Sequence, residues 1–306
     1  MRTIRLAYRD NDRTPVIYCI KAMAERHYGV TVEVIQIEEQ VDFEAALFQG
    51  HCDVIIEHIE YLHTEAARGK KVTLFCAPQV QRGLQLIVPQ SFNSLDDLRG
   101  KTMAVRDLGR PHRITLWLRK IGLEKDVKTI IVTDKEFGRW KQWRKVINGE
   151  SAACFIAPIY LPQALAAGLK VFPATEAEVV SLFAQACTAE FGARNAALLK
   201  DYMKAVIHAL ALVIYRRDEA MEIISQEPMR LMKITDRAEL RRQADSIAKL
   251  LRVKPYPTIE AILNTNEIAA QEYGPTVDNP LTLWDLHWVK ELDDEGFIDQ
   301  IITDLS

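Results

Sequence analysis

The sequence predicts an α/β protein, and three observations carry that prediction. Apolar strand-like runs alternate with amphipathic helix-like segments from residue 3 to about residue 180. Such alternation is typical of a parallel sheet with helices on both faces. The chain has 306 residues, more than one hydrophobic core usually serves, which favours two domains. After about residue 180 the pattern is mostly helical, so we expect a helical C-terminal segment that packs back on the first domain.

The first block of elements covers residues 3–78. Its predicted strands are 3–9, 30–38, 52–58 and 70–78, and its predicted helices are 14–29, 41–50 and 60–69. The first predicted helix has the usual start and stop signals, with Thr14 as N-cap, Pro15 as its first helical residue and Gly29 at its end.

A second block, residues 83–180, repeats the alternation and predicts a second sheet. Its predicted strands are 84–88, 103–105, 127–133, 151–158 and 169–174, and its predicted helices are 94–98, 111–121, 137–150 and 159–168. The return from this block to the first is expected in residues 181–192, which resemble a crossing strand.

Composition and charge exclude several classes of partner. The net charge of −3 favours neither nucleic acid nor an anionic membrane surface. No run reaches the ~18 apolar residues that span a bilayer, so we do not expect a membrane-embedded protein. The opening residues contain no secretory signal. As written, the chain is expected to be cytoplasmic; it would be periplasmic if a leader had been removed from it.

The five cysteines are scattered and form no C-x-x-C pair. The simplest interpretation is buried thiols in a reducing compartment, with a single bridge in an oxidising compartment as the alternative.

The strongest candidate for a binding site is the junction between a strand and a helix at residues 103–121. Its candidate residues are Arg106, Gly109, Arg110 and His112. An arginine fork grips a carboxylate, sulfonate or phosphate at two points, and a helix start adds favourable potential. In the alternative interpretation, Arg110 and Arg113 point to water and Pro111 merely begins the helix.

Two further strand ends carry polar side chains. Arg9, Asp12 and Arg13 follow the first strand, and either line a ligand cleft or form an ordinary exposed loop. His58 and Tyr61 follow the third strand and are expected to form a hydrogen-bonding wall. A metal site there is not expected, because no compact ligand spacing is present.

A fourth candidate corner follows the predicted strand at 151–158. Pro158 and Tyr160 are expected to cover an apolar ligand face, although Tyr160 capping the domain core is an equal alternative.

Several motifs, taken in order, resemble the type II periplasmic-binding-protein fold. They are "FEAALFQGHCDVIIEH", "AARGKKVTLFCAP", "SFNSLDDLRGKTMAVRDLG", "VINGESAACFIAP" and "TAEFGARNAALLKDYMKAVIHAL". Within that fold, the chain looks like the branch that holds thiamine-pyrimidine-synthase-like proteins and the solute-binding proteins for sulfonates and nitrate. The resemblance covers roughly residues 3–225. The cysteine-rich motif of the pyrimidine-synthase enzymes is absent, which argues against that reaction.

The resemblance implies two lobes, each a mixed sheet flanked by helices, with a helical C-terminal extension. Lobe one would be residues 1–79 plus 184–306, and lobe two residues 80–183. The ligand would lie in the cleft between them, at the carboxyl ends of strands.

Two functions are expected from this fold. The first is a solute-binding protein of an ABC-type uptake system, which binds a small carboxylate or sulfonate, aromatic ones included, without a cofactor. Its partners would be that anion and a membrane permease, and the protein would be a monomer or homodimer. The alternative is a cytosolic enzyme, either a decarboxylase or lyase acting on an organic acid or a cofactor-biosynthesis enzyme. Its catalytic candidates are His58, His112 and Glu57. A regulator's sensor domain is disfavoured because no helix-turn-helix pattern is present.

Overall fold

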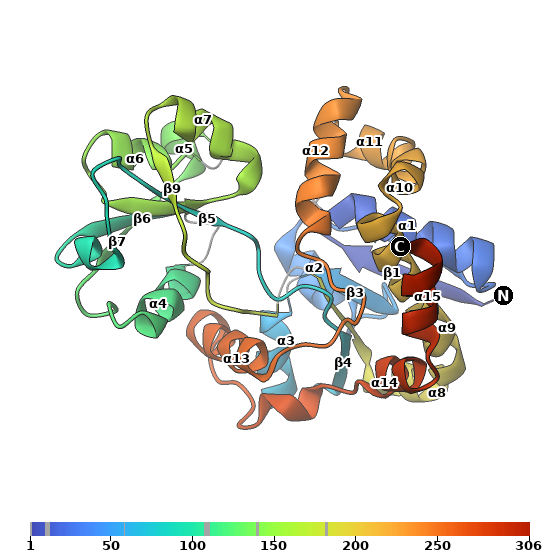
Figure 1. The fold of residues 1–306 in the computed structure, drawn as a ribbon. Helices are drawn as coiled ribbons and strands as arrows, with labels where there is room; N and C mark the ends of the chain where they lie inside the picture. Colours follow the sequence, from blue (N-terminus) through green and yellow to red (C-terminus); the bar gives the residue numbers. More distant parts are fainter. Residues whose placement is uncertain (1, 10–12, 58, 107–110, 139–140, 181–182) are drawn as a thin grey trace. The chain divides into compact units, whose positions relative to one another are not determined.

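The computed structural model describes residues 2–9, 13–57, 59–106, 111–138, 141–180 and 183–306. The chain forms two compact units (Figure 1): unit 1 is Met1–Val80 with Val179–Ser306, and unit 2 is Gln81–Glu178. Each unit is built on its own five-stranded mixed sheet flanked by helices. The predicted fold class is therefore confirmed.

The sheet of unit 1 has the strand order β2-β1-β3-β10-β4. Its strands are β1 (Thr3–Tyr8), β2 (Thr31–Gln36), β3 (Val54–Glu57), β4 (Val72–Cys76) and β10 (Ala184–Thr188). Strands β1, β2 and β3 are parallel, whereas β10 is antiparallel to both β3 and β4. Ala184 pairs with Glu57, and Gln185 pairs with Cys76. The first residues of β10 therefore lie at the edge where β3 and β4 end.

An ion pair aligns β1 with the start of β3. The Asp53 carboxylate accepts hydrogen bonds from the Arg5 backbone N–H (2.9 Å), Nε (3.1 Å) and Nη2 (2.6 Å). Two-point contacts of this kind fix geometry as well as add energy. This contact holds the two strands in the register that brings their carboxyl ends to one edge.

Helices cover both faces of the unit 1 sheet. On one face, α1 (Thr14–His27) and α9 (Ala196–Tyr215) pack together over the larger apolar core. On the other face, α2 (Gln40–Ala46), α3 (Glu60–Ala67) and α13 (Ile259–Tyr273) contribute to a second core.

The C-terminal part of the chain is helical, as expected, and it lies in unit 1. The short helix α8 (Ala189–Arg194) precedes α9. The remaining helices of the C-terminal part are α10 (Arg217–Ile224), α11 (Glu227–Leu231), α12 (Arg237–Ala248), η5 (Pro280–Leu283), α14 (His287–Asp294) and α15 (Phe297–Leu305). Backbone hydrogen bonds join it to β4 and the residues after it: Ala77 N–H donates to Pro255 C=O, and Asp285 N–H donates to Leu74 C=O, both at 2.9 Å.

The sheet of unit 2 has the order β7-β6-β8-β5-β9. Its strands are β5 (Gln85–Val88), β6 (Thr102–Arg106), β7 (Lys128–Val132), β8 (Ala153–Ile156) and β9 (Lys170–Phe172). Its helices are η2 (Leu95–Leu98), α4 (Pro111–Lys120), α5 (Asp134–Phe137), α6 (Trp143–Ile147), η4 (Pro158–Tyr160) and α7 (Leu161–Ala166). Trp117 of α4 packs edge-to-face on Phe155 of β8, with ring centroids 4.9 Å apart.

The prediction of one continuous helix over residues 137–150 is wrong. The structure has two short helices instead, α5 ending at Phe137 and α6 beginning at Trp143. Gly138 has a φ of +89°, a left-handed conformation that ends a right-handed helix.

All five cysteines are free and buried, which confirms the prediction of buried thiols. Burial raises the pKa of Cys19, Cys52 and Cys187 to about 12, and that of Cys76 and Cys154 further. Within the described part of the chain, no helix combines the length and apolar character needed to cross a bilayer.

One buried and one half-buried histidine, His63 and His208, predict how the free energy of unfolding depends on pH. Burial lowers the pKa of His63, which hydrogen-bonds Asn266 at 2.9 Å, and of His208, which hydrogen-bonds Tyr28 at 3.1 Å. Below pH ~6.5 the unfolded chain protonates these rings before the folded chain does. Their contribution to the free energy of unfolding is therefore complete above pH ~6.5 and declines as the pH falls toward their lowered pKa values.

We expect His208→Gln to reduce this dependence. Urea unfolding at pH 7.5 and pH 5.5 checks the expectation: the loss of unfolding free energy on acidification should be smaller in the variant than in the parent chain. An equal or larger loss in the variant would show that His208 does not contribute in this direction.

Candidate functional site

The carboxyl edge of the unit 1 sheet brings together residues from three separate parts of the chain. Strand β1 ends at Tyr8, β3 ends at Glu57, and β10 begins at Ala184. Ligands of open α/β sheets bind at edges of this kind. This edge is therefore the first place to look for a binding site in unit 1.

Arg13 is the most informative side chain at this edge. It precedes the first turn of α1 and is only 7% exposed. Its guanidinium carbon lies 5.2 Å from the ring centroid of Phe183, the residue just before β10. Among the described residues, no carboxylate lies within ion-pair distance of Arg13, and its Nε has no hydrogen-bond acceptor. A buried guanidinium group that contacts an aromatic ring, with no carboxylate beside it, can still form an ion pair with an anionic ligand.

Gln185 follows Phe183 by two residues on β10 and was not predicted as a site residue from the sequence. It is fully buried, and neither atom of its amide has a hydrogen-bond partner among the described residues. Its sheet partners Ile56 and Cys76 belong to the core under α1, so Gln185 faces the side of the sheet that α1 covers. The unit 1 edge cluster is defined here as Arg13, Phe183 and Gln185: one cation, one ring and one amide.

The other face of the same edge is acidic. Glu57 ends β3 and Glu60 begins α3, and both side chains are fully buried. Glu57 pairs with Ala184, which belongs to the core under α2 and α3, so this carboxylate points away from the α1 side. Glu60 lies in the first turn of α3, where the helix dipole stabilises a negative charge.

Of the other predicted unit 1 residues, Arg9 is partly exposed and its Nη1 donates to Gln40 Oε1 at 3.2 Å. Tyr61 is buried on α3, where its ring packs edge-to-face on Phe43 with centroids 6.5 Å apart. Asp12 and His58 lie outside the described residues.

In unit 2, the junction after β6 buries two guanidinium groups. Arg106 ends the strand, and Arg113 lies in the first turn of α4. Gly109 and Arg110 lie outside the described residues, and His112 is partly exposed. The alternative in which Arg113 points to water is wrong, because this side chain is buried.

A carboxyl group faces Arg113 from the end of unit 2. Burial raises the pKa of Glu176, although the Leu84 N–H donates to it at 3.2 Å and the charges of Arg82 and Arg113 act in the opposite direction. The sequence did not indicate this grouping, because Glu176 comes from the segment that leaves the unit 2 sheet. This grouping places two cationic side chains, Arg82 and Arg113, near the Glu176 carboxyl group, whose raised pKa disfavours ionisation.

The fourth predicted corner is a short 3₁₀ helix, Pro158–Tyr160. Both Pro158 and Tyr160 are partly buried, and Tyr160 packs on the unit 2 core. Contact of either residue with a ligand stays a prediction. No three His, Cys, Asp or Glu side chains of the described residues are grouped as metal ligands would be.

Three solved structures show which known fold the chain shares. The periplasmic sulfonate-binding protein SsuA of Methylobacillus flagellatus KT is 18% identical, with 97% of this chain and 96% of that chain covered and a TM-score of 0.69. The alkanesulfonate-binding protein SsuA of Xanthomonas axonopodis pv. citri, solved with MOPS bound, is 14% identical, with coverages of 94% and 99% and a TM-score of 0.57. A conserved Candida albicans gene product with the generic periplasmic-binding-protein fold is 14% identical, with coverages of 92% and 94% and a TM-score of 0.57.

Identities this low establish a common fold and nothing finer. No curated protein sequence matches the chain. The predicted resemblance to periplasmic binding proteins is confirmed at the level of the fold. The sequence model of the NMT1/THI5-like family matches residues 26–220, well over half of the chain, and the chain therefore belongs to that family.

Proposed function

We propose that this protein is a solute-binding protein that closes around a small organic anion, a carboxylate or a sulfonate. In this proposal units 1 and 2 act as two lobes, and the ligand contacts the strand ends of both. The protein would hand the ligand to a membrane permease, and would then work in the periplasm. Its ligand contacts would include the edge cluster of unit 1 and the β6–α4 junction of unit 2.

The observation that carries the proposal is the buried guanidinium of Arg13. Removing a charge from water costs several kcal/mol unless a partner compensates, and buried charges are therefore normally paired. The described residues supply Arg13 with a ring but no carboxylate. An anionic ligand would supply the missing charge, and the amide of Gln185 would donate a hydrogen bond to it.

Unit 2 supports the same ligand class. The predicted anion-binding residues Arg106 and His112 lie where a strand ends and a helix of ten residues begins. Two of the similar structures are sulfonate-binding proteins, one of them bound to MOPS, which is itself a sulfonate. These relatives make sulfonates the first ligands to test.

Calorimetry with matched pairs of compounds tests the proposal. The pairs are benzenesulfonate with benzenesulfonamide and benzoate with benzamide, and MOPS is a further anion. We expect at least one anion to bind measurably, with an affinity that falls as salt is added, and its neutral partner to bind at least about tenfold more weakly. Binding of the neutral compounds but of none of the anions would overturn the proposal.

The buried carboxylates Glu57 and Glu60 favour a second candidate function, an enzyme acting on an organic acid. A site that only binds an anion gains nothing from a carboxylate nearby, whereas a decarboxylase or lyase needs an acid or base. Replacing Glu57 by glutamine separates the two functions. A binding protein should keep or improve its anion affinity, whereas an enzyme should lose turnover of any carboxylate that the parent chain converts.

A further inference from the structure

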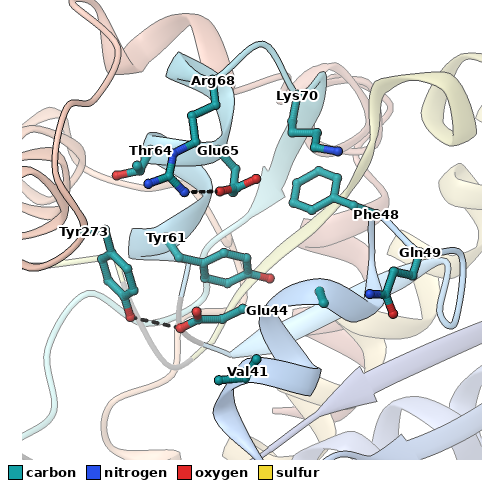
Figure 2. Close-up of a pocket in the computed structure, with 11 residues that line it drawn as sticks. Val41, Glu44, Phe48, Gln49, Tyr61, Thr64, Glu65, Arg68, Lys70 and Tyr273 are labelled. Atoms are coloured by element: carbon teal, nitrogen blue, oxygen red, sulfur yellow. Dashed lines mark hydrogen bonds and ion pairs between the residues drawn. The ribbon is translucent and has the colours of Figure 1, made fainter.

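A pocket of about 340 Å³ opens on unit 1, on the sheet face covered by α2, α3 and α13 (Figure 2). Its lining comes from α2 and the turn after it, from α3 and the segment before β4, and from the last residue of α13. The edge cluster with Arg13 faces the opposite side of the sheet. The pocket is therefore separate from the proposed anion site, and its volume lies at the small end of the range for ligand pockets, ~300–1,000 Å³.

A buried hydroxyl points into this pocket without a partner. Tyr61 is 3% exposed, and its Oη has no hydrogen-bond partner among the described residues. Figure 2 shows the ring inside the pocket, with its hydroxyl directed toward the side of Phe48 and Gln49. Burial raises the pKa of Tyr61 well above its usual value, so the hydroxyl keeps its proton as a donor. Buried polar groups in native proteins are normally satisfied, and this hydroxyl is available to hydrogen-bond a ligand in the pocket.

The pocket also contains one carboxylate and one ammonium that do not pair with each other. Among the described residues, Glu44 Oε1 accepts hydrogen bonds from two neutral donors, Gln40 Nε2 at 2.7 Å and Tyr273 Oη at 3.1 Å. The Lys70 ammonium lies 5.4 Å from the ring centroid of Phe48. Within the described residues, neither Glu44 nor Lys70 has an oppositely charged group at ion-pair distance.

The remaining charges of the lining are already satisfied. Arg68 Nη1 donates to Glu65 Oε1 at 2.6 Å, and this pair forms one wall of the pocket. One negative and one positive charge therefore remain for a ligand, with the rings of Phe48 and Tyr61 beside them.

We propose that this pocket binds a small zwitterion with an apolar ring, of the aromatic amino-acid type. Its ammonium would face Glu44, and its carboxylate would face Lys70 and the hydroxyl of Tyr61. Its ring would pack against Phe48 and Tyr61. A second ligand site on unit 1 would let the protein respond to a compound other than the anion that it carries.

Calorimetry with L-phenylalanine and two analogues that each lack one charge tests the assignment. We expect the full chain to bind L-phenylalanine at one site, and to bind phenethylamine and 3-phenylpropanoate at this site at least about tenfold more weakly. Glu44→Gln should weaken the binding of L-phenylalanine and of phenethylamine about tenfold but leave the binding of 3-phenylpropanoate unchanged. Lys70→Gln should instead weaken the binding of 3-phenylpropanoate and leave that of phenethylamine unchanged. Tyr61→Phe keeps the ring and should weaken L-phenylalanine several-fold.

Two controls make the result specific. Glu38→Gln makes the same chemical change at an exposed position outside the lining and should leave the affinity unchanged. Arg13→Gln should also leave L-phenylalanine binding unchanged, even where it abolishes binding of the anion, so the two proposals fail independently. The assignment is overturned if L-phenylalanine does not bind at millimolar concentrations, or if its binding is lost in Arg13→Gln and kept in the three pocket variants.

Discussion

Replacing Arg13 by glutamine is expected to weaken binding of a small carboxylate or sulfonate by about 30-fold or more. Loss of one partner from a buried charge pair costs ~2–5 kcal/mol, and each 1.4 kcal/mol corresponds to a factor of ten in affinity. Arg13 is 7% exposed, and no carboxylate of the described residues lies within ion-pair distance of it, so an anionic ligand would be its main counter-charge. Calorimetry with the tightest-binding anion of the panel measures the effect directly.

The matched control for this variant is Arg241→Gln. Arg241 lies on α12 in the same unit, is 39% exposed and pairs with Asp218 and Asp245 at the surface. Its replacement should change the affinity less than about twofold, because Arg241 is exposed, already pairs with carboxylates, and exposed ion pairs contribute ~0–1 kcal/mol. An Arg13→Gln protein that folds normally and binds the anion as tightly as the parent chain would remove the basis of the proposed function.

Replacing Trp117 by alanine is expected to give the largest loss of stability. The side chain is 1% exposed in the core of unit 2, where it packs against Phe155. Deletion of a buried aromatic ring of this size removes its transfer free energy and leaves a cavity, at a cost of ~3–5 kcal/mol in unfolding free energy. Amide hydrogen exchange in β6 and β8 measures the stability of unit 2 separately from that of unit 1.

Leu165→Ala is the control within the same unit. Leu165 lies on α7 and is 43% exposed, so its truncation should change the unfolding free energy by less than about 0.5 kcal/mol. If Trp117→Ala lowered the protection of β6 and β8 by less than 1 kcal/mol, roughly the cost of a single lost methylene, the packing of α4 on β8 would not be a main support of unit 2.

Much of the fold follows from local sequence patterns. The alternation of apolar runs and amphipathic segments predicts both sheets, because each strand or helix needs an apolar face toward the core and the turns between them favour residues such as Gly and Pro. The apolar run that contains residues 184–188 is found as the return strand β10. The break at Gly138 was missed because a glycine within a helical pattern is often tolerated, and only the backbone shows its positive φ.

The candidate site was less predictable, and its arginines show why. Arg9 and Arg13 look equivalent in the sequence, yet Arg13 is buried and Arg9 is partly exposed, because the first turn of α1 carries Arg13 toward Phe183. The position of Gln185 depends on the antiparallel pairing of β10, which joins residues about 130 positions apart in the sequence. Arg113 did leave a signal: it lies four residues before the buried Trp117, on the same face of α4.

The five buried, protonated thiols have a practical consequence. Thiolates, not thiols, react with maleimides and iodoacetamides, so the native cysteines should label very slowly in the folded protein. A single cysteine introduced on the surface of each unit would then be the only fast-reacting pair, and fluorescent or spin probes could be attached without first replacing native residues. Distances between such probes, with and without an anion, would reveal whether the two units move toward each other.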